Sequence, residues 1–122
     1  MKILVSDIEG YQKLRGKSER LLAECQALTD FPSVHKNMGI NLGRDYADIY
    51  IAYEEFQNTV LLAEKMTSKE YTFKVGILEG RIKTRMKSIQ TVASTNLNLK
   101  NKVEQFLIAK NAVVEYLLEI AD

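Results

Sequence analysis

Hydrophobic residues recur every three or four positions along most of this chain, which is the spacing that one face of an α-helix requires. The pattern predicts a first helix over about residues 6–30, in which Ser18 fills the single polar slot of the stripe. Pro32 is expected to end this helix, because the residue before a proline avoids the helical region. The apolar positions of the stripe are Ile8, Tyr11, Leu14, Leu21, Leu22, Cys25 and Leu28.

A second helix is predicted over about residues 45–66. Asp45 is placed to cap it by accepting a hydrogen bond from a free backbone N–H. Its stripe is rich in aromatic residues and consists of Tyr46, Ile49, Tyr50, Tyr53, Phe56, Val60 and Ala63. Because these positions must form the inward face of the helix, we expect the aromatic rings to lie in the core, with the tyrosine hydroxyls at its rim.

Two more helices are predicted after the second one. The stretch "TSKE" places Thr67 three residues before Glu70, which is the spacing of a capping box, so a third helix is expected over about residues 67–92. The segment "EYTFKVGI" also alternates with period two, which leaves a short strand over residues 70–77 as an alternative to the helix that we favour. A fourth helix over about residues 98–121 follows the polar turn "ASTNLN".

The stripe of the third helix consists of Tyr71, Val75, Leu78, Ile82, Met86 and Ile89. The stripe of the fourth consists of Leu99, Val103, Phe106, Leu107, Val113, Leu117 and Ile120. With four such stripes, we predict one all-α domain over residues 1–122, in which four amphipathic helices form a bundle or extended helical hairpins, with a short N-terminal strand as an added option. A chain of 122 residues is long enough to bury a core without disulfides or metals.

The segment over residues 31–44 contains the only proline, two glycines and two asparagines, and is predicted to be a loop with at most one helical turn. It is long for a connection, and long loops are often functional. His35, the only histidine, lies in it and is expected to be a loop or surface residue. Cys25, the only cysteine, is expected to be a small core residue, so neither an internal disulfide nor a cysteine-based zinc site is predicted.

The opening stretch "MKILVSDIEG" offers the one catalytic alternative. It resembles the first metal-binding strand of two families, the exonucleases with an Asp-x-Glu motif and the haloacid-dehalogenase phosphatases, which implies Mg²⁺ held by Asp7 and Glu9. Both families need further strands that bring more oxygen ligands to the metal, and the later chain predicts only helices. We therefore favour a helix start in which Ser6 and Glu9 form a capping box, and we predict no metal, cofactor or catalytic residue.

Charge is distributed unevenly, although the net charge is only +1. Residues 67–102 carry eight basic against two acidic side chains, whereas residues 45–66 carry five acidic against one basic. One interpretation is that an acidic and a basic helix pack side by side and their rims attract. The other is a nucleic-acid surface, since clustered cations neutralise phosphates. The candidate phosphate contacts are Lys74, Arg81 and Arg85 on one flank of the third helix, and Lys83 and Lys87 on its far side.

The second helix also carries apolar residues away from its stripe. Ile51 and Leu62 project from the opposite side, with Met66 nearby. A helix on the outside of a monomeric bundle does not need apolar residues on both sides. Either this helix is buried all round, or Ile51, Leu62 and Met66 form an interface with another chain, which we favour and which allows a homodimer.

These observations predict a small non-enzymatic helical protein that acts through protein–protein interaction. An inhibitor or adaptor of the kind found among phage-borne accessory proteins is the analogy for its class, and the partner is a protein of unknown identity. The alternative is a nucleic-acid-binding accessory factor that uses the basic segment 67–102. The chain has no apolar run long enough to cross a bilayer and no signal peptide, so no membrane partner and a cytoplasmic location are expected.

Overall fold

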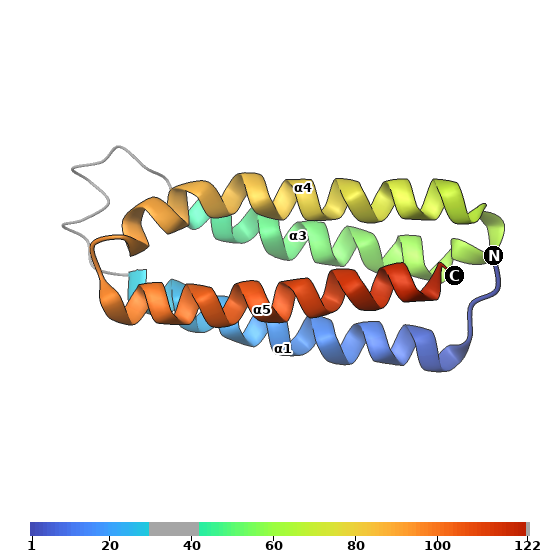
Figure 1. The fold of residues 1–122 in the computed structure, drawn as a ribbon, viewed down its shortest axis with the longest axis horizontal. Helices are drawn as coiled ribbons and strands as arrows, with labels where there is room; N and C mark the ends of the chain where they lie inside the picture. The colour runs from blue at the N-terminus through green and yellow to red at the C-terminus, as the bar shows by residue number, and fades with distance from the viewer. Residues whose placement is uncertain (30–41, 122) are drawn as a thin grey trace.

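The computed structural model describes residues 1–29 and 42–121, which form an antiparallel four-helix bundle (Figure 1). Helix α1 spans Val5–Thr29, α3 spans Leu42–Leu61, α4 spans Ser68–Ala93 and α5 spans Leu97–Ile120. A short 3-10 helix, η1, spans Ala63–Lys65 between α3 and α4. The predicted all-α architecture is therefore confirmed, and the option of a short N-terminal strand is not seen in the described residues.

The bundle is built from two closely packed helix pairs. Helix α1 packs most extensively against α5, although the two lie at opposite ends of the sequence, and α3 packs most extensively against α4. The α4–α5 and α1–α3 contacts are smaller and join the two pairs. Each helix therefore has two neighbours and keeps one side for solvent.

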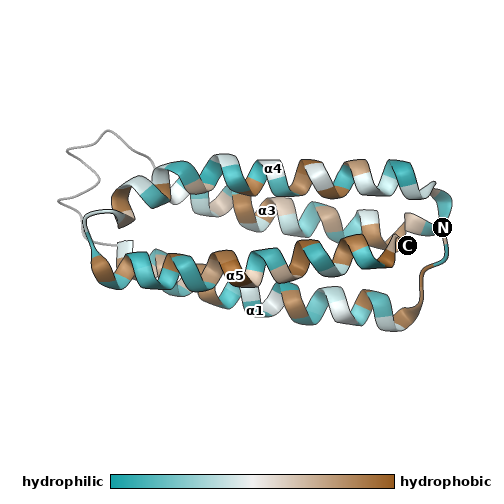
Figure 2. Ribbon diagram, in the orientation of Figure 1, coloured by the Kyte–Doolittle hydropathy of each residue, from teal (hydrophilic) through white to brown (hydrophobic). Residues whose placement is uncertain are grey.

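The apolar stripes face the centre of the bundle, and hydrophobic and hydrophilic residues alternate along every ribbon in Figure 2. Three rings from three helices meet in the core. The centroid of the Phe56 ring lies 5.9 Å from that of Tyr11 and 6.1 Å from that of Tyr71, with tilted planes that suit the electrostatics of aromatic pairs. Ser18 is buried as the polar member of the α1 stripe.

The structure corrects two predicted helix starts. Helix α3 begins at Leu42, so Asp45 lies in its first turn, where it is buried, and does not cap it. Helix α1 begins at Val5, so Ser6 lies inside the helix and cannot be its cap. The Asp7 carboxylate instead accepts a hydrogen bond from the Leu4 N–H at 2.9 Å. In both cases the residue chosen from the sequence is a good capping type, but the helix begins before it.

The start of α4 agrees with the predicted cap. Thr67 has an extended backbone, and its side chain accepts a hydrogen bond from the Glu70 N–H at 3.1 Å. Residues 70–77 are helical throughout, so the alternative of a strand there is wrong. Asn96 caps α5 in the same way, accepting from the Leu99 N–H at 3.2 Å.

The chain start crosses one end of the bundle. Residues 1–4 have no regular secondary structure, and the Met1 ammonium donates a hydrogen bond of 2.7 Å to the Met66 carbonyl oxygen. The end of α5 lies at this same end of the bundle (Figure 1). The first residues therefore tie α1 to the α3–α4 connection.

Gly10 permits the close approach of α1 to α5. A Cβ atom at this position would lie 2.0 Å from the Tyr116 hydroxyl oxygen, which is closer than atoms can approach. The Tyr116 hydroxyl reaches over Gly10 and donates to the Ser6 carbonyl oxygen at 3.3 Å. The absence of a side chain at Gly10 therefore lets Tyr116 pack against α1.

The described residues include only the end of the predicted 31–44 loop. Residues 30–41, which include Pro32 and His35, lie outside the described residues. Residues 42–44 form the first turn of α3, so the end of the predicted loop is wrong.

Candidate protein-interaction surface

The outward side of the α3–α4 pair carries large apolar side chains that the chain itself leaves in solvent. On α3, Ile51 is 43 % exposed and Leu62, just past its end, is 50 % exposed. On α4, Phe73 is 69 % exposed and Ile77 is 47 % exposed. These four residues, with Gly76 and Gly80 of α4, are called the hairpin surface below.

The two helices frame a shallow groove on this side of the bundle. It has a volume of about 170 Å³, and Ala52, Phe56 and Thr59 of α3 line it together with Ile77 and Leu78 of α4. Ile51 is the chain neighbour of Ala52, and Phe73 lies one turn before Ile77 on the same side of α4. Ile77 therefore lines the groove, Ile51 and Phe73 lie next to it, and the charged residues Glu55, Lys74 and Arg81 complete its lining.

The structure shows where the three predicted interface residues lie. Ile51 and Leu62 point to solvent as the spacing predicted, so α3 is not buried all round. Met66 follows η1 and is partly buried. Phe73 and Ile77 were missed in the sequence, although they stand off the α4 stripe at a spacing of four, which is the same signal that singled out Ile51 and Leu62.

Both candidate arginines of the nucleic-acid surface form ion pairs with acidic residues of α3. Arg81 binds the Glu55 carboxylate at 2.5 Å. Arg85 lies 3.5 Å from Asp45 and also pairs with Asp48. These contacts support the interpretation that an acidic and a basic helix attract across a shared rim, because the charges of Arg81 and Arg85 are already balanced within the chain.

The candidate lysines are arranged differently from the arginines. Lys74, Lys83 and Lys87 are exposed, and among the described residues none of them makes an ion pair. Lys74 lies beside the groove with Arg81, whereas Lys83 and Lys87 lie one turn apart further along α4. The structure therefore does not bring the five predicted phosphate contacts into one uniformly basic patch.

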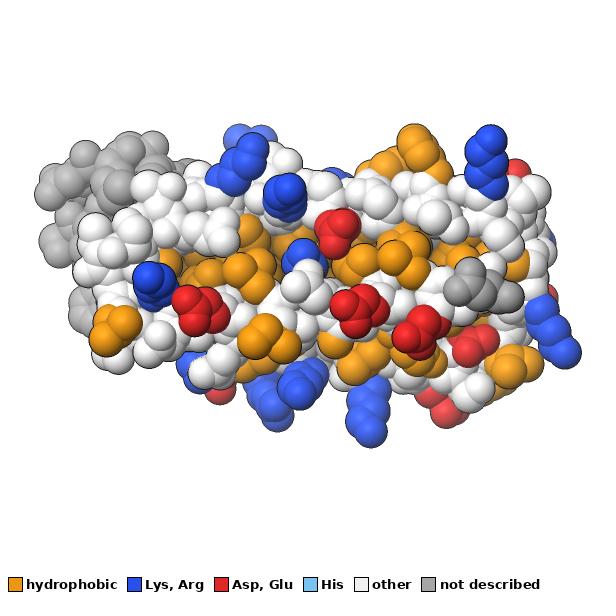
Figure 3. Space-filling model, viewed as in Figure 1, with side chains coloured by type: hydrophobic (Ala, Val, Ile, Leu, Met, Phe, Trp, Pro, Cys, Tyr) orange, Lys and Arg blue, Asp and Glu red, His pale blue; other side chains and the backbone are white. Residues whose placement is uncertain are grey.

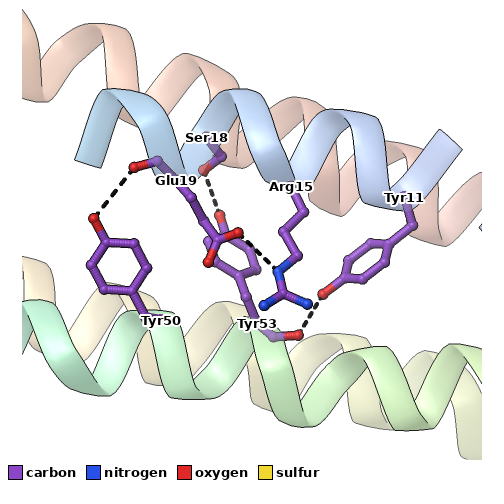
Figure 4. Close-up of polar contacts among 6 residues, drawn as sticks. All are labelled: Tyr11, Arg15, Ser18, Glu19, Tyr50 and Tyr53. Atoms are coloured by element: carbon purple, nitrogen blue, oxygen red, sulfur yellow. Dashed lines mark hydrogen bonds and ion pairs between the residues drawn. The ribbon is translucent and has the colours of Figure 1, made fainter. Parts of the chain in front are cut away.

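The opposite side of α3 has a different character (Figure 4). Tyr11 of α1 donates a 2.8 Å hydrogen bond to the Tyr53 carbonyl oxygen, and the Tyr53 hydroxyl lies 2.7 Å from the Ser18 Oγ. Tyr50 donates to the Glu19 carbonyl oxygen at 3.3 Å. The hydroxyl of Tyr53 is buried between the helices and does not reach the rim, so that expectation is wrong for it.

Burial raises the pKa of several side chains in the core. It raises the pKa of the Tyr53 hydroxyl far above its ordinary value, against a smaller lowering by the hydrogen bond to Ser18. Burial likewise raises the pKa of Tyr71, whose hydroxyl has no hydrogen-bond partner in the described part of the chain. The Cys25 thiol is buried as predicted, and burial raises its pKa to about 11, so it stays protonated and unreactive near neutral pH.

The opening carboxylates lie in the first helical turns of α1. Asp7 bonds to the backbone of Leu4, and Glu9 is exposed. Residues 1–29 and 42–121 contain no group of three or more histidine, cysteine, aspartate or glutamate side chains placed to hold a metal ion.

Figure 3 shows the face formed by α4 and α5, which is turned to the viewer, with a band of hydrophobic side chains along the seam and charged side chains on both sides. Lys110 of α5 is largely buried at this seam, and its Nζ lies 3.6 Å from the Glu79 carboxylate of α4. Hydrophobic side chains also protrude from the upper edge of α4, away from the seam. Contacts between α4 and α5 span the seam, whereas the side chains that protrude from the upper edge of α4 stand clear of it in this view.

Comparison of the chain with protein-family models, with curated proteins and with solved structures finds no match. Among the described helices, none combines the length and the apolar character that crossing a membrane requires.

Proposed function

We propose that this protein is a small non-enzymatic binding protein that acts through protein–protein interaction, as an inhibitor or adaptor does, and that the hairpin surface is its binding site. The observation that carries the proposal is the exposure of Ile51, Leu62, Phe73 and Ile77 around one groove. Contiguous exposed apolar residues on a small domain mark interaction sites, because leaving them in water forgoes about 25 cal/mol for each Å² that a partner would cover.

The surroundings of this apolar cluster suit a protein partner. The ion pairs Arg81–Glu55 and Arg85–Asp48 lie along the same pair of helices and hold its backbone in place. A rigid apolar centre with a charged rim is the usual anatomy of a protein interface.

Affinity capture with matched variants tests the proposal. Three tagged proteins serve as bait: wild type, the double variant Phe73→Glu, Ile77→Glu, and the control Leu97→Glu. The proteins offered to them include an untagged copy of this chain. Leu97 is an exposed apolar residue at the start of α5, so the control carries the same kind of change away from the hairpin surface. Wild type and control should retain a protein that the Phe73/Ile77 variant loses, with all three equally helical by circular dichroism. Identical capture by all three would contradict the proposal.

A nucleic-acid-binding accessory factor is the second candidate, and the exposure of Lys74, Lys83 and Lys87 favours it. If α4 binds phosphates, the measured affinity for a DNA or RNA duplex should fall steeply with salt, and a Lys83→Ala, Lys87→Ala variant should reduce the salt slope by about one unit for each lost contact. Arg81→Ala should change this slope less, because Arg81 is already paired with Glu55. The absorbance of the purified protein at nucleic-acid wavelengths provides the first check, and absence of binding at low salt would remove this candidate.

A further inference from the structure

Two glycines of α4, like Gly16 of α1, stand beside open space in the described part of the chain. Gly76 and Gly80 lie one turn apart in the middle of the helix, and a Cβ atom on either would meet nothing within 4 Å. Glycine weakens a helix interior relative to alanine, and neither position has the backbone conformation that requires glycine. Gly10 shows the contrast, since Tyr116 occupies the space beside it. Gly76 and Gly80 leave a hollow on the outer side of α4, and at Gly80 this hollow is polar, because Arg44, Asp48 and Thr84 line it as well.

We infer that the occupant of the hairpin surface is a second copy of this chain, related by a twofold axis parallel to the helices, so that α3 of each copy lies along α4 of the other. This inference rests on the proposed function, because it identifies the protein that the same surface binds. A twofold interface places the same patch on both copies, and the hairpin surface supplies an apolar ridge and, at Gly76 and Gly80, room for the ridge of the other copy.

Charge selects this orientation over the other twofold arrangement. An axis perpendicular to the helices would place α3 against α3 and α4 against α4, which sets like charges against each other. Helix α3 is acidic overall, with Arg44 opposed by Asp45, Asp48, Glu54 and Glu55. Helix α4 is basic overall, with Glu70 and Glu79 opposed by Lys69, Lys74, Arg81, Lys83, Arg85 and Lys87. With the axis parallel to the helices, each acidic helix faces a basic one, so the ion pairs that Arg81 and Arg85 already form within each copy lie against pairs of the opposite order and not against like charges.

The heights of the residues along the two helices agree with this pairing. Ala52 shares the groove with Ile77, Leu78 and Arg81, which places its neighbour Ile51 at the level of Gly80. A rotation about an axis parallel to the helices preserves height, so Ile51 of one copy faces Gly80 of the other. Leu62 and Phe73 both lie toward the η1 end of the pair, and helical side chains lean toward the helix N-terminus, which brings the Phe73 ring toward the level of Leu62.

The size of the surface is sufficient for a specific but modest dimer. Helix α3 has 20 residues and is therefore about 30 Å long, and two helices packed side by side are about 20 Å wide. The pair offers roughly 600 Å² on each copy, or about 1,200 Å² in total, which is the lower end of specific interfaces.

Sedimentation equilibrium with two matched glycine variants tests the inference. Gly80→Leu fills the hollow, whereas Gly16→Leu makes the same change at an exposed position of α1 that is equally open. Wild type and Gly16→Leu should be dimers, and Gly80→Leu should raise the dimer Kd at least tenfold. In protein dilute enough that all three are monomers, both variants should melt no lower than wild type, because leucine is the better helix former. A wild type that is monomeric at about 100 µM would overturn the inference, as would a Gly80→Leu variant that dimerises normally.

Disulfide trapping tests the orientation. Ile51→Cys and Gly80→Cys proteins are oxidised separately and as a mixture, with Cys25 left in place because it is buried and protonated. Crosslinked dimer should form in the mixture and not in either protein alone. Crosslinking of Ile51→Cys to itself would overturn the pairing of α3 with α4. If wild type is monomeric but the hairpin surface captures a different protein, this inference fails and the proposed function stands. If hairpin variants alter neither assay, both fail.

Discussion

Tyr53 and Ile51 stand two residues apart on α3, yet the first is fully buried and the second lies in solvent. On the side of Tyr53, α1 supplies Ser18 for the hydroxyl and Tyr11 for the backbone carbonyl. On the side of Ile51, the described part of the chain supplies no cover. The difference teaches that one helix can serve two purposes. Its inward side is packed against the rest of the fold, and we propose that its outward side binds another chain.

The largest expected effect comes from alanine substitutions on the two sides of α3, which test whether only the inward side contributes to stability. Phe56→Ala removes a ring packed between Tyr11 and Tyr71 and should lower the free energy of unfolding by about 3–5 kcal/mol. Ile51→Ala, measured in dilute protein, should change it by no more than about 0.5 kcal/mol, because the side chain is already half in water. Urea unfolding followed by circular dichroism measures both. Equal effects would mean that the outward side is part of the core.

The second prediction uses the titration of the buried side of α1. Burial raises the pKa of Cys25 to about 11 from an ordinary 9.0, so the folded chain keeps a proton that the unfolded chain releases. Its contribution is complete below pH 9.0 and is lost as the pH rises through about 11, with a total of roughly 2–3 kcal/mol. Tyr11, Tyr53 and Tyr71 act in the same direction at higher pH.

Unfolding by urea at a series of pH values measures this loss. A Cys25→Ala variant is less stable at neutral pH because it leaves a cavity, but its stability should fall less steeply than that of wild type between pH 9.0 and about 11. Identical slopes would show that the thiol is not shielded from water.

The third prediction compares two buried tyrosine hydroxyls. Tyr53→Phe leaves the buried Ser18 hydroxyl without its partner and should lower the free energy of unfolding by about 1–3 kcal/mol. Tyr71→Phe removes a hydroxyl that has no partner in the described residues, so stability should stay the same or rise. The double variant Tyr53→Phe, Ser18→Ala should recover part of the loss. If Tyr71→Phe lowered the free energy of unfolding as much as Tyr53→Phe, the Tyr71 hydroxyl would have a hydrogen-bond partner, against this prediction.

Much of this arrangement can be predicted from local rules. Every residue of the four predicted stripes is buried or packs against the core, and Thr67 caps α4, because helical period and capping depend on residues within one turn of each other. The outward exposure of Ile51 and Leu62 follows from the same period. The predicted caps Asp45 and Ser6 were wrong, because Asp45 pairs with Arg85 inside α3 and because Asp7, not Ser6, accepts the hydrogen bond at the start of α1.

The sequence by itself determined four amphipathic helices, their inward faces and the presence of apolar residues on the outward side of α3, since each depends on spacing along one helix. Only the tertiary structure decided that α1 pairs with α5, that Arg81 and Arg85 are balanced by the acidic residues of α3, and that Ile77 shares a groove with the helix that carries Ile51. These relations join residues that are distant in sequence, and helical period places a side chain around its own axis but does not say which helix lies beside it.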